Sequence, residues 1–129
     1  MTPISFKREI SATVDQAIER ATKALCTEGF GVLTRIDMHS KIKDKIGKDI
    51  IPTVILGACN PNLAYEAYTA NSDVASLLPC NAVIREIAPG KISLEFVKPT
   101  AMMQILGDAK LAELAREADT KIERALGNV

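Results

Sequence analysis

The chain has few aromatic residues and no excess of charge of either sign. It contains no tryptophan, aromatic residues make up 4% of its 129 residues, and sixteen basic side chains balance sixteen acidic ones. Binding of nucleic acid through its phosphates needs a surplus of basic residues, and stacking of single-stranded bases needs aromatic side chains. We therefore expect no nucleic-acid partner.

Long apolar runs are also missing. The longest uncharged segment, Ile50 to Tyr65, is interrupted by Pro52, Gly57 and Pro61, whereas a membrane-spanning helix needs about twenty apolar residues. No apolar stretch of signal-peptide length follows Met1. We expect a cytoplasmic protein without a membrane partner, folded as a single domain over residues 1–129 around one hydrophobic core.

Residues that bind metals are scarce. The single histidine, His39, is far in sequence from Cys59 and Cys80 and stands beside a lysine-rich segment, so the sequence does not predict a zinc site. In a reducing compartment the three cysteines are expected to be free thiols, with Cys26 in the core beside an apolar helical stripe. Two thiolates suit a soft monovalent ion such as copper, but with no further ligand nearby we expect no metal and no cofactor.

Hydrophobic periodicity predicts alternating strands and helices along the first half of the chain. Thr13 and Gln16 have the spacing of a capping box, which predicts that a helix begins at Val14. Alternation of apolar residues predicts strands, and apolar residues three or four apart predict helices. The expected strands are 4–10, 30–37 and 53–58, and the expected helices are 14–27 and 39–48.

The second half contains four further signals. Asn60 followed by Pro61 is typical of a helix start. Pro89 and Gly90 suit a type II turn, which predicts a β-hairpin of strands 81–87 and 91–97. A short turn is expected at 73–78, and a long amphipathic helix begins near Asp108. Together these elements predict an α+β fold, with a mainly antiparallel sheet and helices packed largely on one face.

Two similar phrases set a Cys-Asn step beside a proline. They are Leu56-Gly57-Ala58-Cys59-Asn60-Pro61 and Leu78-Pro79-Cys80-Asn81. The first cysteine ends a predicted strand, and the second begins the next strand. Antiparallel pairing of these strands would bring both cysteines to the same edge of the sheet, whereas parallel pairing would separate them.

Three segments in this order resemble the domain of unknown function 302 family. They are Gly29 to Asp37, Ile55 to Pro61 with Ala64 following, and Leu77 to Asn81. The resemblance implies a small prokaryotic protein, typically a homodimer, whose β-α-β(n)-α fold with inserted short helices is like one repeat of the TATA-box-binding protein. It implies no established activity, and the fold carries no DNA-binding function with it.

The leading hypothesis is a module that binds a small molecule or a partner in a pocket near the two Cys-Asn phrases. Asn60, Asn81 and Tyr65 are the candidate ligand-binding residues, although capping is the plainer role for the two asparagines. The alternative is a thiol enzyme for sulfur or redox transfer, with Cys59 as nucleophile and Cys80 as supporting thiol. A helix N-terminus next to Cys59 would favour its thiolate, but no histidine is available as a base.

A third alternative is a structural or regulatory interaction protein. The apolar cluster of Met102, Met103, Ile105 and Leu106 suits core packing or a dimer interface. The lysine-rich segment 39–48 is either an anion-binding patch or a solvated helix face, and the aspartates among its lysines favour the solvated face. The sequence therefore leaves open whether the protein is an enzyme.

Overall fold

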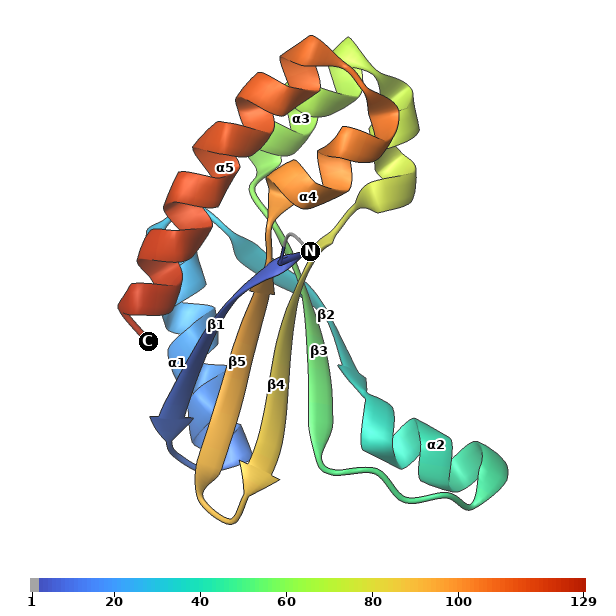
Figure 1. Ribbon diagram of the computed structural model, residues 1–129, viewed down its shortest axis with the longest axis vertical. Coiled ribbons are helices and arrows are strands. Elements are labelled where there is room, and N and C mark those ends of the chain that lie inside the picture. The colour runs from blue at the N-terminus through green and yellow to red at the C-terminus, as the bar shows by residue number, and fades with distance from the viewer. Residues whose placement is uncertain (1–2) are drawn as a thin grey trace.

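The structure is a computed structural model that describes residues 3–129, and it contains a single five-stranded sheet (Figure 1). The strand order is β1-β5-β4-β3-β2, and every neighbouring pair is antiparallel. The predicted α+β class is therefore confirmed. The strands are β1 (Ser5–Ser11), β2 (Gly31–Asp37), β3 (Thr53–Cys59), β4 (Cys80–Ala88) and β5 (Lys91–Val97).

Helices alternate with the strands much as the sequence pattern predicts. The α-helices are α1 (Val14–Thr27), α2 (Met38–Ile46), α3 (Pro61–Ala70), α4 (Pro99–Met103) and α5 (Ala109–Gly127), and two 3-10 helices are η1 (Ser72–Leu77) and η2 (Gln104–Leu106). The predicted capping box is present, because the Thr13 hydroxyl accepts from the Gln16 amide and the Gln16 side chain accepts from the Thr13 amide. Helix α4 was not predicted.

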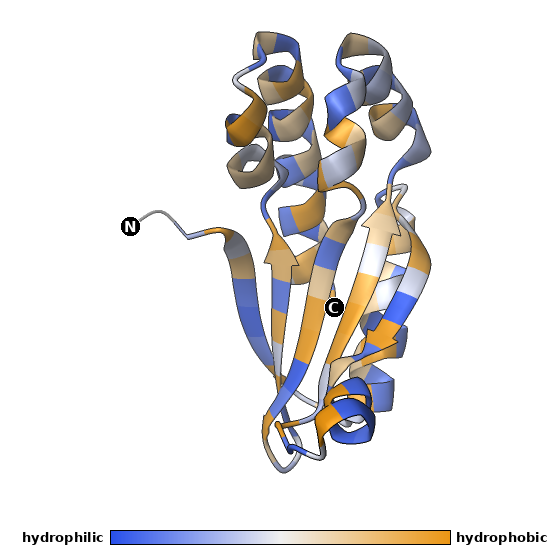
Figure 2. Ribbon diagram, turned by 90° about the vertical axis from the view of Figure 1, so that its right-hand side faces the viewer, coloured by the Kyte–Doolittle hydropathy of each residue, from blue (hydrophilic) through white to orange (hydrophobic). Residues whose placement is uncertain are grey.

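The main core lies between one face of the sheet and helices α1 and α5. Alternate strand residues such as Val54, Leu56, Ile84 and Leu94 are almost completely buried there, as the two-residue period of a strand requires. Among residues 3–129 no such helical layer covers the opposite face, which is turned toward the viewer in Figure 2. The prediction that helices pack largely on one face is therefore confirmed.

Arg8 interrupts the apolar face of β1 because it binds the C-terminal end of α5. Its guanidinium group donates hydrogen bonds to the carbonyl oxygens of Leu126, Gly127 and Val129, at 2.9, 3.1 and 3.1 Å. The last carbonyl groups of a helix have no partners within the helix, and they carry partial negative charge. A cation at this position therefore stabilises the helix end and holds α5 against β1.

A second, smaller core lies beyond the ends of the strands. Helices α3, η1 and α4 and the N-terminal half of α5 form a cap above the sheet in Figure 1. Asp119 of α5 holds α4 in place, since its carboxylate accepts from the Thr100 amide at 3.0 Å and from the Thr100 hydroxyl at 2.6 Å. The buried residues of this cap are Ala67, Val74, Met103, Leu111, Leu114 and Ala115.

Cys26 is exposed, so its predicted place in the core is wrong. The buried residues of α1 are Ala17, Ala21, Ala24 and Leu25. Cys26 follows Leu25 by one residue, which turns its side chain by about 100° around the helix axis, away from the sheet. The apolar stripe of α1 is narrower than its sequence pattern suggests.

Gly57 allows β3 to pass close to its neighbours just before the cavity described below. A Cβ atom at this position would lie 2.2 Å from Thr34 Oγ1 and 2.7 Å from Pro79 Cγ. Gly31, on the adjacent strand β2, has no atom within 4 Å of the corresponding position. The two glycines therefore differ in packing.

We expect Gly57→Ala to lower the free energy of unfolding by about 1–3 kcal/mol, since the added methyl group overpacks this part of the sheet. Gly31→Ala is the matched control, and it should leave the stability unchanged or raise it by up to about 1 kcal/mol. Urea denaturation followed by circular dichroism measures both changes. Equal effects of the two substitutions would contradict the close approach at Gly57.

Candidate functional site

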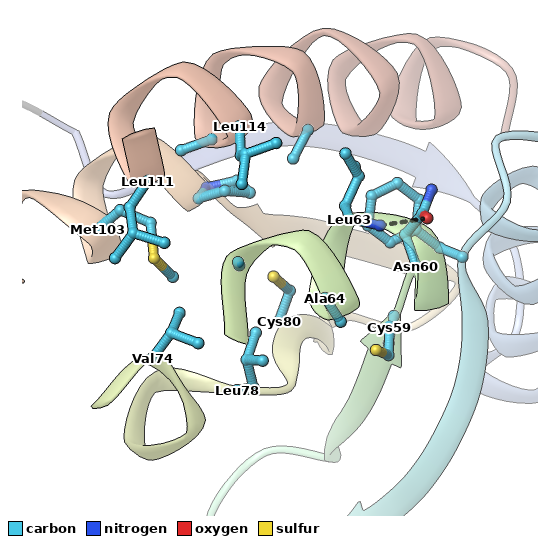
Figure 3. A pocket seen from close by; sticks show the side chains of 16 residues that line it. Cys59, Asn60, Leu63, Ala64, Val74, Leu78, Cys80, Met103, Leu111 and Leu114 are labelled. Atoms are coloured by element: carbon cyan, nitrogen blue, oxygen red, sulfur yellow. Dashed lines mark hydrogen bonds between the residues drawn. The ribbon is translucent and has the colours of Figure 1, made fainter. Parts of the chain in front are cut away.

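An apolar cavity lies between the sheet and the helical cap (Figure 3). Its volume is about 50 Å³, and about 470 Å³ when all free space out to its mouth is included. None of its lining residues is charged. They are Phe30, Ala58, Cys59, Asn60, Leu63, Ala64, Ala67, Val74, Leu78, Cys80, Pro99, Met103, Leu111, Leu114, Ala115 and Ala118.

The pairing of β3 with β4 brings Cys59 and Cys80 to the same end of the sheet. These strands are antiparallel, with Ala58 opposite Cys80. Antiparallel pairing is the arrangement that brings both cysteines to one edge of the sheet. Successive side chains of a strand point to opposite faces, which places Cys80 on the face of Ala58 and Cys59 on the other face. Figure 3 shows the two side chains at separate places beside the cavity.

Both thiols are neutral at pH values near 7. Burial raises the pKa of the Cys59 thiol. Burial, the negative charge of Cys59 when it is ionised and the Asp119 carboxylate together raise the pKa of Cys80 to about 11, because each of these factors disfavours the Cys80 thiolate. The shift at Cys59 is opposite to the one expected from the neighbouring helix N-terminus.

Asn60 lines the cavity and caps α3. Its Oδ1 atom accepts a hydrogen bond from the Leu63 amide at 3.2 Å, and its Nδ2 atom donates to the Glu28 carbonyl at 3.4 Å. The side chain thus joins the end of α1 to the start of α3. Asn60 therefore has the capping role that the sequence suggested for it.

Asn81 and Tyr65, the other two candidate ligand-binding residues, lie outside the cavity lining. Asn81 is exposed and pairs with Gly57 on the uncovered face of the sheet. The Tyr65 side chain lies on α3 and is 71% exposed. Neither side chain therefore lines the cavity, and ligand binding by Asn81 or Tyr65 stays a prediction.

The half of the cavity that the helical cap supplies was not predicted from the sequence. Val74, Met103, Leu111 and Leu114 come from segments outside both Cys-Asn phrases. One signal for them was the methionine-rich cluster, in which Met103 is buried while Ile105 is 70% exposed. Another signal was the length of the apolar stripe on α5, whose N-terminal half packs in the cap rather than on the sheet.

No group of three or more His, Cys, Asp or Glu side chains within residues 3–129 is arranged to hold a metal ion. His39 lies at the other end of β3, where the Thr53 amide donates to its Nδ1 atom at 3.0 Å. Within the same residues, no helix is both long and apolar enough to cross a membrane. The cavity is thus built from apolar side chains, two neutral thiols and one amide.

We expect iodoacetamide to alkylate Cys80 in the folded protein near pH 8 at least about a hundredfold more slowly than in the urea-unfolded chain. The thiolate is the nucleophile, and a pKa of about 11 in place of 9.0 leaves about a hundredfold less of it. The rate should rise about tenfold for each added pH unit below that pKa. Mass spectrometry of tryptic peptides measures the labelling of each cysteine.

The exposed Cys26 in the same samples shows that the reagent is active. Rapid labelling of Cys80 in the folded protein at neutral pH would contradict a buried, neutral thiol. That result would instead support the thiol-transfer alternative.

Comparison with known proteins agrees with the architecture described above. The model of the family "Domain of unknown function DUF302" matches residues 6–129. The crystal structure of the uncharacterized conserved protein DUF302 from Bacillus stearothermophilus superposes with a TM-score of 0.91, at 28% identity over 98% of each chain. None of the curated proteins compared with the chain matches it. The chain therefore belongs to the DUF302 family.

Proposed function

We propose that this protein binds a small, uncharged and mainly apolar molecule in the cavity between the sheet and the helical cap. The observation that carries the proposal is the composition of the lining, in which no side chain is charged and only Cys59, Asn60 and Cys80 bear polar groups. An apolar hollow with a few polar groups at fixed places is typical of small-molecule sites.

The chemistry of the lining supports a neutral ligand. A carboxylate, phosphate or ammonium group placed here would lose its hydration without gaining an opposite charge, which costs several kcal/mol. Both thiols are protonated near pH 7 because burial raises the pKa of each. The amide of Asn60 already makes two hydrogen bonds within the protein. An apolar ligand gives up no hydrogen bonds to water when it enters the cavity, so it needs no new partner there.

The size of the cavity supports a ligand whose buried part is only a few atoms. The volume of about 50 Å³ is several times the 10–15 Å³ that one water molecule needs, and about a third of a 150 Å³ cavity that admits benzene. A larger ligand would extend into the mouth of the cavity. The cavity and its mouth together contain about 470 Å³ of free space. The half-buried thiol of Cys59 borders this space.

The same observations give no support to a thiol enzyme. Nucleophilic catalysis by cysteine needs a thiolate, and therefore a lowered pKa or a nearby base. Burial raises the pKa of both Cys59 and Cys80, and the cavity lining contains no histidine. Binding of a neutral ligand requires neither a thiolate nor a base, so it agrees better with this lining.

We expect Ala64→Leu to abolish ligand binding, because Ala64 lies on the cavity wall (Figure 3) and a leucine there fills the space. Ala70→Leu on the same helix is the matched control, since Ala70 is exposed and does not line the cavity. Both substitutions exchange one good helix former for another. Methyl resonances in NMR spectra, recorded during titration with benzene and with benzoate, measure binding.

The expected result is saturable shifts at Leu63, Leu111 and Leu114 with benzene and none with benzoate, in the wild type and in Ala70→Leu. Ala64→Leu should show no such shifts. Binding of benzoate as tight as that of benzene, or identical binding by the two variants, would contradict the proposal.

A further inference from the structure

One wall of the cavity comes from a short segment between α3 and β4. The segment consists of the 3-10 helix η1 and the residues on either side of it, Asn71 and Leu78. Val74 and Leu78 line the cavity from this segment, and Figure 3 shows both side chains across the cavity from Leu114. We call residues 71–78 the η1 segment.

The hydrogen bonds of the η1 segment are local. The Val74 amide donates to the Asn71 carbonyl at 3.1 Å, and the Leu78 amide donates to the Ala75 carbonyl at 3.4 Å. The one side-chain hydrogen bond of the segment within residues 3–129 joins the Asp73 amide to Asn71 Oδ1 at 3.0 Å. A six-residue 3-10 helix is itself unusual, because poor hydrogen-bond geometry makes runs of more than about four residues uncommon.

Helix α4, another short helix of the cap, is held more firmly. Asp119 of α5 accepts two hydrogen bonds from Thr100 of α4. In the described part of the chain, the η1 segment has no comparable side-chain bond to α3, α4 or α5. Apolar contacts therefore keep the η1 segment in place.

Val74 is the side chain that anchors the η1 segment. It is the buried residue of η1 and is 0% exposed, and it packs in the core of the cap, against which Leu77 and Leu78 also pack. The other four residues of η1 are exposed, and they are Ser72, Asp73, Ala75 and Ser76. Release of one valine and two half-buried leucines would thus free the segment.

The mouth of the cavity lies on the side of α3 and the η1 segment. All the lining residues that α4 and α5 supply are buried, so these two helices form the deep wall. The half-buried lining residues are Cys59, Asn60, Leu63, Ala64, Leu78 and Cys80. A molecule that enters from solvent therefore meets α3 and the η1 segment first.

The η1 segment has the properties of a part that opens while the rest of the protein stays folded, since such parts have few buried contacts and few tertiary hydrogen bonds. We propose that it is a flap, which swings away from the cavity about Asn71 and Leu78 and so admits and releases a small uncharged molecule. Both residues have extended backbone at the ends of η1, and residues at the ends of elements absorb the change in backbone angles when a lid moves. The claim rests on the proposed function, because it adds a route of entry to the same ligand site.

Native-state hydrogen exchange tests whether the flap opens by itself. It is followed by NMR at increasing urea concentrations below the unfolding transition. We expect the Val74 and Leu78 amides to be protected at least about a hundredfold less than the Leu56 and Ile84 amides of the sheet core, with almost no dependence on urea. Equal protection and equal urea dependence of the two pairs would overturn the proposal, since the flap would then open only when the whole chain unfolds.

A comparison of Val74→Ala with Val54→Ala tests whether the flap controls entry. Both valines are 0% exposed, and Val54 lies in the core between the sheet and the helices. We expect Val74→Ala to raise the rate at which iodoacetamide, a small uncharged reagent, alkylates Cys80 in the folded protein at least about tenfold, and Val54→Ala to change it less than about twofold. Circular dichroism checks that both variants are folded, and equal rates would overturn the proposal.

Ala75→Gly weakens the flap without removing a buried side chain, so it tests the proposal even if Val74→Ala does not fold. Ala75 is exposed and does not line the cavity, and Ala109→Gly at the exposed start of α5 is the matched control. Because glycine loosens a helical backbone, we expect Ala75→Gly to raise the Cys80 alkylation rate about twofold to fivefold. NMR line shapes should show the same increase in the association and dissociation rates of benzene, with an unchanged dissociation constant.

The outcomes separate the flap from the proposed function. Failure of benzene to bind to any variant would refute the proposed function, and the Cys80 rates would still decide whether the flap admits a small molecule. Rates that are the same in Ala75→Gly and Ala109→Gly would overturn the flap, because molecules would then reach the cavity by another route.

Discussion

The antiparallel pairing of β3 with β4 determines where the candidate site lies. Because Ala58 stands opposite Cys80, the end of β3 and the start of β4 meet at one edge of the sheet. The chain leaves this edge through α3 and returns to it through η1, and α4 and α5 complete the cap above it. The close approach at Gly57 keeps this region compact. The cavity is the space between the ends of these strands and the helices of the cap.

Burial controls the chemistry of this space. The environment that makes the cavity apolar also raises the pKa of Cys59 and of Cys80, so the burial on which the proposed ligand site rests also disfavours both thiolates. The Asn60 amide also has little free hydrogen-bonding capacity, because its oxygen and its nitrogen both bond to backbone groups that join α1 to α3. Cys59, Asn60 and Cys80 of the two Cys-Asn phrases thus form part of the cavity wall.

Local patterns predicted most of the fold, and long-range packing decided the rest. The capping box at Thr13, the Asn60-Pro61 helix start and the Pro89-Gly90 hairpin depend on neighbouring residues, and all three are present. The placement of Cys59, Met103 and Leu111 around one cavity depends on contacts between distant segments, which periodicity does not encode. The exposure of Cys26 was missed for the same reason, because the width of a buried stripe depends on what packs against it.

The central claim is that the space between the sheet and the helical cap is a dry cavity able to accept an apolar molecule. A crystal of the protein pressurised with xenon tests this directly, since xenon enters apolar cavities and its anomalous scattering locates it. We expect a xenon atom inside the cavity, in contact with Leu63, Leu111 and Leu114 and next to the Cys80 side chain. A cavity that contains no xenon and holds ordered, hydrogen-bonded water instead would contradict it.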